Sequence, residues 1–263
     1  MLSSDNSTFD YQPDRIYTVR EFEAINDWLK THHLGISDIP IIHFELDSSG
    51  KLIPVSQTPV YIEGAVAEIG RQLGNWNIHS KQNGAITASQ GGFNLTTAGG
   101  RTIRAPDIAF IPKETYRALT QEQLLSFQGQ PFSPTFVVEV EDLTLESKLS
   151  VLTKKFKDEY FPAGIELGWL IDPVNKSIYT FKRTVSGSVR RHNHGWRDVT
   201  GRDVLPEFIL DIMVMDNILS QSSSGSSDSE KIECPKCDLT FKSDNKFIKH
   251  YERDHALKKR KLH

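Results

Sequence analysis

The sequence predicts an α/β fold followed by a small metal-binding module. Three apolar segments, RTIRAPDIAF, TFVVEVE and GWLID, have the length and β-branched composition of strands. Between the last two, the segment ESKLSVLTKKFKDEYF places apolar residues at helical spacing. Near the C-terminus, two cysteines and two histidines stand at the spacing of a metal site. Strands that alternate with helices are typical of an α/β domain.

Size and charge favour a large domain joined to a small one. The chain has 263 residues, of which 38% are hydrophobic and 25% are charged, as in soluble globular proteins. Residues 231–263 hold ten Lys/Arg against five Asp/Glu, whereas residues 1–230 hold 21 against 29. This pattern indicates a basic tail on an acidic body, and the acidity argues against tight nonspecific nucleic-acid binding by the body.

The sequence also indicates a cellular compartment. Only two cysteines are present, both in the tail, which excludes a disulfide-stapled secreted fold. The N-terminal segment MLSSDNSTFDYQPDR lacks a signal pattern, and no apolar run approaches the ~20 residues that cross a bilayer. We expect a soluble intracellular protein without a membrane partner.

The first elements are a helix, a hairpin and a second helix. Thr18 and Glu21 have the spacing of a capping box, in which each side chain accepts from the other residue's backbone N–H. PIIHFELD and KLIPV flank a turn that ends at Gly50, so they predict a β-hairpin. TPVYIEGAVAEIGRQLGNW predicts the next helix, and it carries Glu63. Paired glycines from residue 84 to 101 separate short β-prone pieces and indicate hairpin turns.

The central strands carry acidic residues. In RAPDIAF, Asp107 alternates with Ile108 and points away from the apolar face. Residues 112–134 form a polar connection, with room for a short helix around residues 122–127. In TFVVEVE, Glu139 and Glu141 share a face opposite Phe136 and its apolar partners. A buried carboxylate is costly unless a proton, a cation or a metal compensates its charge.

A helix over residues 146–161 and a strand–turn–strand unit complete the body. Leu149, Leu152, Phe156 and Tyr160 make the packing face of the helix, and Gly164 caps it. IELGWLID and SIYTFKR then flank a turn, and edge strands with a closing segment run to about residue 219. The triplet at residues 192–194 is interpreted as an exposed hairpin rather than a catalytic site.

Composition divides the chain into four parts. SQSSSGSSDSE is a flexible linker by composition. We therefore predict a domain at residues 16–219, a linker at 220–230, a metal-binding module at 231–257 and a basic tail at 258–263.

The module resembles a classical two-Cys two-His zinc finger. Cys234-x2-Cys237-x12-His250-x4-His255 matches its spacing, and Phe241 and Phe247 stand where its small core needs apolar residues. The resemblance covers about 22 residues and implies Zn²⁺ binding that supplies the folding energy of a ββα unit.

The resemblance also implies where the finger reads DNA. Ser243, Lys246 and Lys249 would be the base-reading positions, although a lone finger covers only ~3 base pairs. Protein binding is the alternative. The basic segment HALKKRKLH is read as a nuclear address, as an arm for phosphate or as a solvated charge run.

The body resembles the restriction endonuclease domains of the PD-(D/E)XK nuclease superfamily. The residues that carry the resemblance are Pro106-Asp107, the strand VVEVE and the block KFKDEYFPAGIELGWLIDP, with a likeness from about residue 18 to 211. It implies a three-layer fold with a mixed sheet and hydrolysis of phosphodiester bonds in DNA. It implies that Asp107 and Glu139 bind Mg²⁺, whose hard oxygen ligands leave water on the ion.

The lysine of the superfamily motif is displaced in this chain. Its position, two residues after the acid, holds Glu141. The resembling family takes its lysine from the following helix, so Lys155 is assigned, with Lys154 and Lys148 as substitutes. Its role is to orient the attacking water or to offset developing negative charge. Glu63 and, less well, Glu45 are further acidic candidates.

Other interpretations remain open at this stage. Asp107 after a proline could end a turn, and Glu139 could pair structurally with Lys148 or Arg104. The leading hypothesis is a Mg²⁺-dependent endonuclease that the finger delivers to DNA, with a homodimer as one arrangement. The rival is a non-catalytic nucleic-acid- or protein-binding factor on a degenerate nuclease scaffold.

Overall fold

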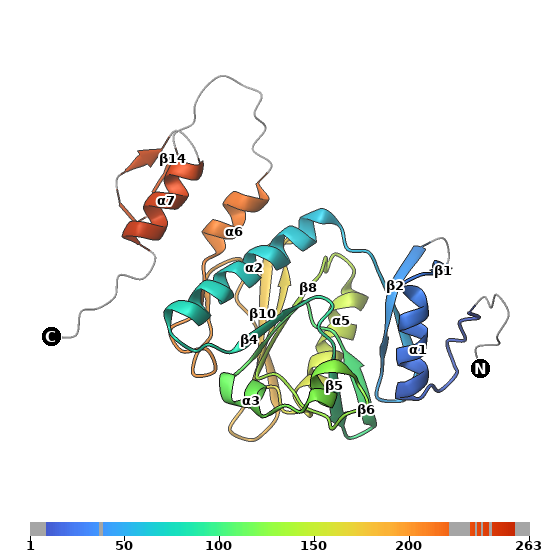
Figure 1. Cartoon of the computed structure of the whole chain (residues 1–263). Helices are drawn as coiled ribbons and strands as arrows, with labels where there is room; N and C mark the ends of the chain where they lie inside the picture. The colour runs from blue at the N-terminus through green and yellow to red at the C-terminus, as the bar shows by residue number, and fades with distance from the viewer. Residues whose placement is uncertain are drawn as a thin grey trace. The chain divides into compact units, whose positions relative to one another are not determined.

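The computed structural model describes residues 9–36, 39–220, 232–234, 236–237, 239–241 and 244–255. The chain divides into two compact units, Met1–Asp211 and Ile212–His263. Figure 1 shows the elements of both units, each of which is described by itself.

A six-stranded mixed sheet forms the centre of the first unit, as the sequence predicted. The strand order is β11-β10-β9-β8-β7-β4, and β8 pairs parallel with β9 while the other neighbours are antiparallel. The strands are β4 (Ala85–Ala88), β7 (Ile108–Ile111), β8 (Phe136–Val140), β9 (Leu167–Asp172), β10 (Ser177–Arg183) and β11 (Val189–Asn193). The valine-rich β8 and the segment GWLID of β9 are buried along their whole length, which explains why both read as continuous apolar runs.

Helices cover both faces of this sheet (Figure 1). On one face, α2 (Val60–His79) contacts β4, β7 and β8, and Trp76 packs edge-on against Phe110 of β7. On the other face, α5 (Glu146–Lys155) continues into a π-helical turn, η1 (Phe156–Tyr160). Phe156 stacks on Phe181 of β10 within a core cluster that also includes Tyr160. The sheet with a helical layer on each face is the expected three-layer α/β architecture.

A second sheet and α1 (Val19–Leu29) form the N-terminal part of the unit. The sheet order is β1-β2-β6-β5, with β3 paired to β2. The strands are β1 (Leu34–Ile36), β2 (Ile39–Leu46), β3 (Leu52–Ser56), β5 (Phe93–Thr97) and β6 (Gly100–Arg104). The predicted capping box of Thr18 and Glu21 is confirmed, and Gly50 adopts φ +82° in the β2–β3 turn.

Some segments differ from the sequence-based expectation. The connection 112–134 contains two short helices, α3 (Lys113–Ala118) and α4 (Gln121–Leu125), the second with its own capping box from Thr120 and Gln123. The helix expected over residues 146–161 changes at Lys155 from α-helical to π-helical hydrogen bonding. The small pair β12 (Val199–Thr200) and β13 (Ile209–Leu210) lies in the closing segment.

The second unit contains α6 (Ile212–Leu219) and a small ββα arrangement. The latter consists of β14 (Ile232–Glu233), antiparallel β15 (Thr240–Phe241) and α7 (Asp244–Asp254). Phe247 and Tyr251 form its small core together with Cys234 and Val214. Residues 221–230 of the predicted linker, Ser243 and the basic tail 258–263 lie outside the described residues.

Candidate active site and Cys/His cluster

A cavity of about 220 Å³ opens at the end of β8, and acidic residues from two strands, one helix and one loop line it. Glu139 is in β8, Asp107 directly precedes β7, Glu45 is in β2 and Glu63 is in the first turn of α2. Lys155, the last residue of α5, lines the same cavity. The structure therefore brings together the three residues that the sequence predicted as a site, although 48 positions separate Asp107 from Lys155 along the printed sequence.

Glu139 is held by two donors from the α5–η1 segment. Its side chain leaves β8 on the face that packs against this segment, where the phenol of Tyr160 donates to Oε1. Lys155 Nζ lies 3.0 Å from the same oxygen. Burial and the adjacent Glu139 carboxylate hold the pKa of Tyr160 well above its ordinary value, so the phenol stays a donor. The structural pairing of Glu139 with Lys148 or Arg104 considered above does not occur: its partners are Lys155 and Tyr160.

The π-helical turn positions both donors. In η1 the amide of Phe161 donates to the carbonyl of Phe156 at 3.0 Å, five residues back, so this turn holds one residue more than an α-helical turn. The wider turn lets Lys155 and Tyr160, five residues apart, approach the same carboxylate. Single π-turns within helices are frequently found at functional sites.

Glu45 lies in a buried ion-pair network rather than among open acids. Its Oε1 lies 3.3 Å from Lys155 Nζ and accepts from the Ala105 amide at 2.8 Å. Its Oε2 accepts from Arg104, which also donates to both oxygens of Glu159. Burial acts to raise the pKa of Glu45, but Lys155 and Arg104 outweigh it, and the pKa is lowered. From the sequence, Glu45 was only a poor ligand candidate, and neither its pairing with Arg104 nor the pairing of Arg104 with Glu159 was identified.

The charges of this network do not cancel. Three buried or half-buried carboxylates, Glu45, Glu139 and Glu159, face two cations, Arg104 and Lys155. Burial acts to lower the pKa of Lys155, but Glu139 and Glu45 outweigh it and raise the pKa, so Lys155 is a cation. With all three acids ionised, the network has one net negative charge before Asp107 is counted, and burial raises the pKa of the Glu139 carboxyl above its ordinary value.

Asp107 adds a further acid beside this surplus. Burial, reinforced by the charge of Glu139, raises the pKa of Asp107 from 3.8 to about 8. Its Oδ2 accepts from the Val140 amide at 2.7 Å, which fixes the carboxyl at the end of β8. At neutral pH this site therefore binds either a proton or another cation.

Each of the two acids has one anchored oxygen and one open oxygen. Within the described part of the chain, no protein group hydrogen-bonds Oδ1 of Asp107 or Oε2 of Glu139. Neither atom is among the buried polar atoms that lack a partner, so both reach solvent. Hard oxygen atoms that are fixed, anionic and accessible are the donors that Mg²⁺ prefers.

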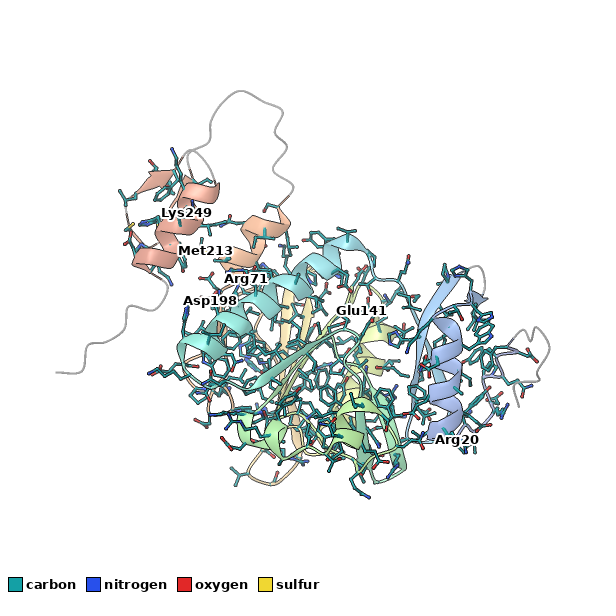
Figure 2. All side chains as sticks on the ribbon, in the orientation of Figure 1. Arg20, Arg71, Glu141, Asp198, Met213 and Lys249 are labelled. Carbon is teal, nitrogen blue, oxygen red and sulfur yellow. The ribbon has the colours of Figure 1, made fainter. Side chains whose placement is uncertain are left out.

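The remaining acidic and basic candidates have other surroundings. Glu141, at the motif's lysine position (labelled in Figure 2), forms a 2.9 Å ion pair with Lys148. Lys154 is exposed, and Glu63 is exposed at the cavity edge, where its charge adds to the raised pKa of Asp107. Of the three lysines on the helix, Lys155 is therefore the one that contacts Glu139.

The segment GWLID ends in a structural carboxylate. Asp172 is 1% exposed and accepts from the amides of Leu143, Val174 and Asn175. It ties the end of β9 to the loop that follows β8. This explains why an acidic residue and a proline close the strand, without a role for Asp172 in the cavity.

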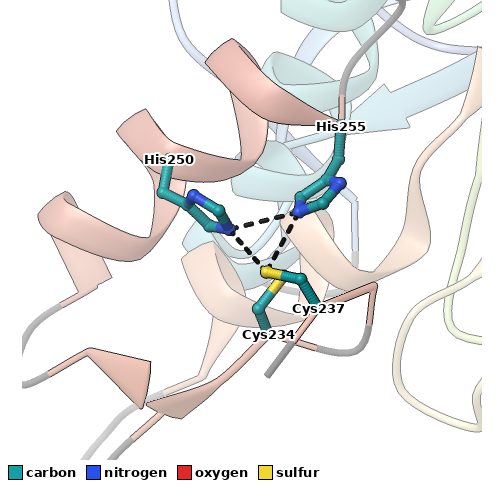
Figure 3. Close-up of side chains that lie close together, drawn as sticks. All are labelled: Cys234, Cys237, His250 and His255. Carbon is teal, nitrogen blue, oxygen red and sulfur yellow. Dashed lines mark hydrogen bonds between the residues drawn. The ribbon is translucent and has the colours of Figure 1, made fainter. Parts of the chain in front are cut away.

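The second unit gathers its cysteines and histidines into one cluster (Figure 3). One potential ligand atom from each of Cys234, Cys237, His250 and His255 lies within 4.8 Å of all the others. His250 Nε2 lies 3.3 Å from Cys237 Sγ and 3.2 Å from His255 Nε2. Two sulfur and two imidazole donors at these distances fit a tetrahedral ion, so the cluster could bind a metal.

The cluster has a supporting carboxylate that sequence reasoning missed. Asp254 Oδ2 lies 2.7 Å from His250 Nδ1, the ring nitrogen that points away from the cluster. The spacing of four residues on α7 was the signal available in the sequence. Lys246 and Lys249, the predicted DNA contacts, are both exposed on α7, and Lys249 is labelled in Figure 2.

No helix among the described residues has the length and apolar character required to cross a membrane.

Comparisons with known proteins identify relatives of the first unit. A family model named Uma2 and described as "Putative restriction endonuclease" matches residues 28–213, more than half of the chain. A solved structure of a nuclease from Anabaena variabilis, described as putative and assigned to DUF820, is similar with a TM-score of 0.49 and 15% identity. The match covers 68% of this chain and 92% of that one. A search of curated proteins finds no match.

Proposed function

Since this chain belongs to the restriction endonuclease family Uma2, we propose that it hydrolyses phosphodiester bonds in DNA with a divalent ion bound by Asp107 and Glu139. The observation that carries the proposal is the pair of open, solvent-reaching carboxylate oxygens in a cavity with surplus negative charge. A cation supplied from solvent would balance that charge.

The donor set suits Mg²⁺. Two carboxylate oxygens on a cavity wall leave room for the water ligands that Mg²⁺ retains. When bound, the ion would polarise the phosphoryl oxygen and lower the pKa of a bound water. The Val140 amide holds Asp107, while Tyr160 and Lys155 hold Glu139, so neither acid must reorganise when substrate arrives.

Lys155 is proposed as the catalytic cation. It stays protonated because Glu139 and Glu45 raise its pKa, so it does not act as a general base at neutral pH. Its ammonium lies at the cavity beside Glu139, where it would orient the water or offset the charge that develops on the phosphate. Glu45 and Arg104 would hold this lysine in place.

A plasmid-cleavage assay with Mg²⁺ or Mn²⁺ tests the proposal. Asp107→Asn and Glu139→Gln should abolish cleavage, whereas Glu166→Gln, at an exposed glutamate outside the cavity lining, should leave it unchanged. Lys155→Ala should lower the rate by about a hundredfold, and the exposed neighbour Lys154→Ala should not. Intact DNA after incubation of the wild type with every divalent ion would overturn the proposal.

We further propose that the cluster of the second unit binds Zn²⁺ and that its ββα unit contacts DNA. The four donors within 4.8 Å support the first point, and the exposed Lys246 and Lys249 support the second. One finger covers only ~3 base pairs, so it would add affinity more than specificity. Purified protein should carry one equivalent of zinc; protein that folds α7 without any zinc would contradict this.

The basic segment 258–263 is proposed as a nuclear address. A fluorescent fusion of the whole chain should accumulate in nuclei, and replacing the four Lys/Arg of this segment by Gln should disperse it. Equal distribution of both fusions would contradict the proposal.

A further inference from the structure

One hairpin of the first unit concentrates positive charge. Residues 176–197 contain six Lys/Arg and no Asp or Glu, within a body where acidic residues outnumber basic ones by 29 to 21. This segment comprises β10, β11 and the chain that follows them, and β11 is an edge strand of the six-stranded sheet. The charges are therefore gathered on an open edge of the fold.

Carboxylates do not neutralise the four cations in the strands. Lys182 of β10 pairs in register with Arg190 of β11, and both are exposed. Arg183 donates to backbone carbonyls of Phe161 and Gly187, which are neutral. Within the described residues, neither of these arginines nor Lys182 forms an ion pair with an acid.

The fourth cation connects the hairpin to the candidate active site. Arg191 Nη1 donates to Thr153 Oγ1 of α5 at 2.8 Å, and its guanidinium lies 5.2 Å from the ring of Tyr179. Lys155 of the same helix lines the cavity. Since a helix with its side chains is about 10–12 Å wide, the hairpin and the cavity lie roughly one helix apart. Lys157, in the adjoining turn η1, is a further exposed cation.

The need to protect an edge strand from pairing with another chain does not explain why all these charges are positive. Charged side chains of either sign discourage an edge strand from pairing with another chain. Opposite charges in register would also stabilise the hairpin, whereas like charges directly opposite destabilise it. The like-charge pair Lys182–Arg190 thus stabilises the hairpin less than a pair of opposite charges would. Such a concentration of one charge sign is typical of a surface that binds an anionic partner.

We propose that the hairpin β10–β11 binds the phosphate backbone of duplex DNA and guides it across α5 into the cavity. The inference rests on the proposed nuclease function and assigns its substrate contacts in the first unit. Duplex DNA carries one negative charge per ~1.7 Å of helix axis, so a duplex seated at the cavity presents several phosphates within one helix width. The contacts are to the backbone and provide affinity without reading sequence.

Fluorescence anisotropy with a short labelled duplex, in the absence of divalent ions so that no cleavage occurs, tests this surface. The full-length variant Lys182→Gln/Arg190→Gln should bind about tenfold more weakly than the wild type, and the slope of log K against log salt should fall by about 2, one for each lost phosphate contact. Its thermal stability should equal or exceed that of the wild type because a like-charge pair is removed. The matched control Lys113→Gln/Arg117→Gln, on α3, should bind like the wild type.

The outcomes separate this proposal from the nuclease activity. Weaker binding and a lower salt slope for the hairpin variant alone would support it. Equal binding by all three proteins, an equal loss in the control, or no duplex binding by the wild type would overturn it. If DNA binding depends on the hairpin but no divalent ion yields cleavage, the result would support the DNA-binding surface and contradict the nuclease proposal.

Discussion

Asp107→Asn should stabilise the metal-free protein at neutral pH while it removes a proposed metal ligand. Burial and Glu139 raise the pKa of Asp107 from 3.8 to about 8, so ionisation of this carboxyl opposes folding. Asparagine has nearly the same shape, keeps an oxygen for the Val140 amide and carries no charge. A carboxyl group whose ionisation is disfavoured in the folded state thus reduces stability until a cation binds beside it.

The size and sign of the effect follow from proton linkage. Well below pH 3.8 both the folded and the unfolded state hold the proton, and the Asp107 carboxyl does not reduce stability. As pH rises toward 8, the unfolded state releases its proton while the folded state retains it, so the wild type loses stability over this window. At 1.36 kcal/mol per pKa unit, the largest stability difference that Asp107→Asn can produce at pH 7 is about 4 kcal/mol. Because the carboxyl is only half-buried and borders a cavity, we expect about 2 kcal/mol.

Urea unfolding, followed by the fluorescence of the buried Trp76 and Trp169, measures the difference. The buffers contain no divalent ions and no chelator, and both tryptophans lie in the first unit, so they report its unfolding rather than that of the Cys/His cluster. The stability gap between Asp107→Asn and wild type should be near zero at about pH 4 and reach its full size by about pH 8. Mg²⁺ should then raise the midpoint of the wild type and leave that of the variant unchanged.

The exposed Asp158→Asn serves as the control and should show no such gap. A variant at Asp107 that is less stable than the wild type throughout, or a gap that does not depend on pH, would refute the reasoning. Either result would mean that the Asp107 carboxyl is solvated or paired in the folded state.

Four further substitutions test individual contacts. Tyr160→Phe removes the hydroxyl that donates to Glu139 and should weaken Mg²⁺ affinity ten- to hundredfold in calorimetry. Unchanged Mg²⁺ affinity would show that this hydrogen bond does not orient the Glu139 carboxylate. Gly168→Ala places a methyl group against a buried ring of η1 and should cost about 1–3 kcal/mol in urea unfolding. Gly74→Ala in α2, where a methyl group meets nothing within 4 Å, should instead stabilise by about 0.5–1 kcal/mol, and the reverse order would contradict the packing described. Asp254→Asn should lower zinc affinity ten- to hundredfold in a chelator competition because the Asp254 carboxylate orients the His250 ring. Equal zinc affinity of the variant and the wild type would show that Asp254 does not orient His250.

Short-range features of this protein were readable in its sequence. The capping box of Thr18 and Glu21 and the positive φ of Gly50 depend on neighbours within four residues. The Cys/His spacing likewise predicted the cluster of the second unit, because residues 234–237 supply both cysteines, and α7 with the residue that follows it supplies both histidines. The alternation of β8 placed Glu139 on the face that packs against the α5–η1 segment.

Partners distant in the sequence were decided by tertiary structure. Glu45 meets Lys155 across 110 positions and Arg104 across 59, and no local pattern marks these encounters. The assignment of Lys155 rested on the helix flank, and only the folded chain shows that its ammonium contacts Glu139 while Lys148 pairs with Glu141. Its catalytic role stays a prediction.

The physical reason for this division is the range of the interactions. Backbone geometry and side-chain period act over a few residues, so they can be read from the chain itself. Burial, surplus charge and the raised pKa of Asp107 exist only when β2, β8, α5 and the segment before β7 surround one cavity. The sequence thus determined which acidic and basic side chains are available for the proposed chemistry, and packing decided which of them interact.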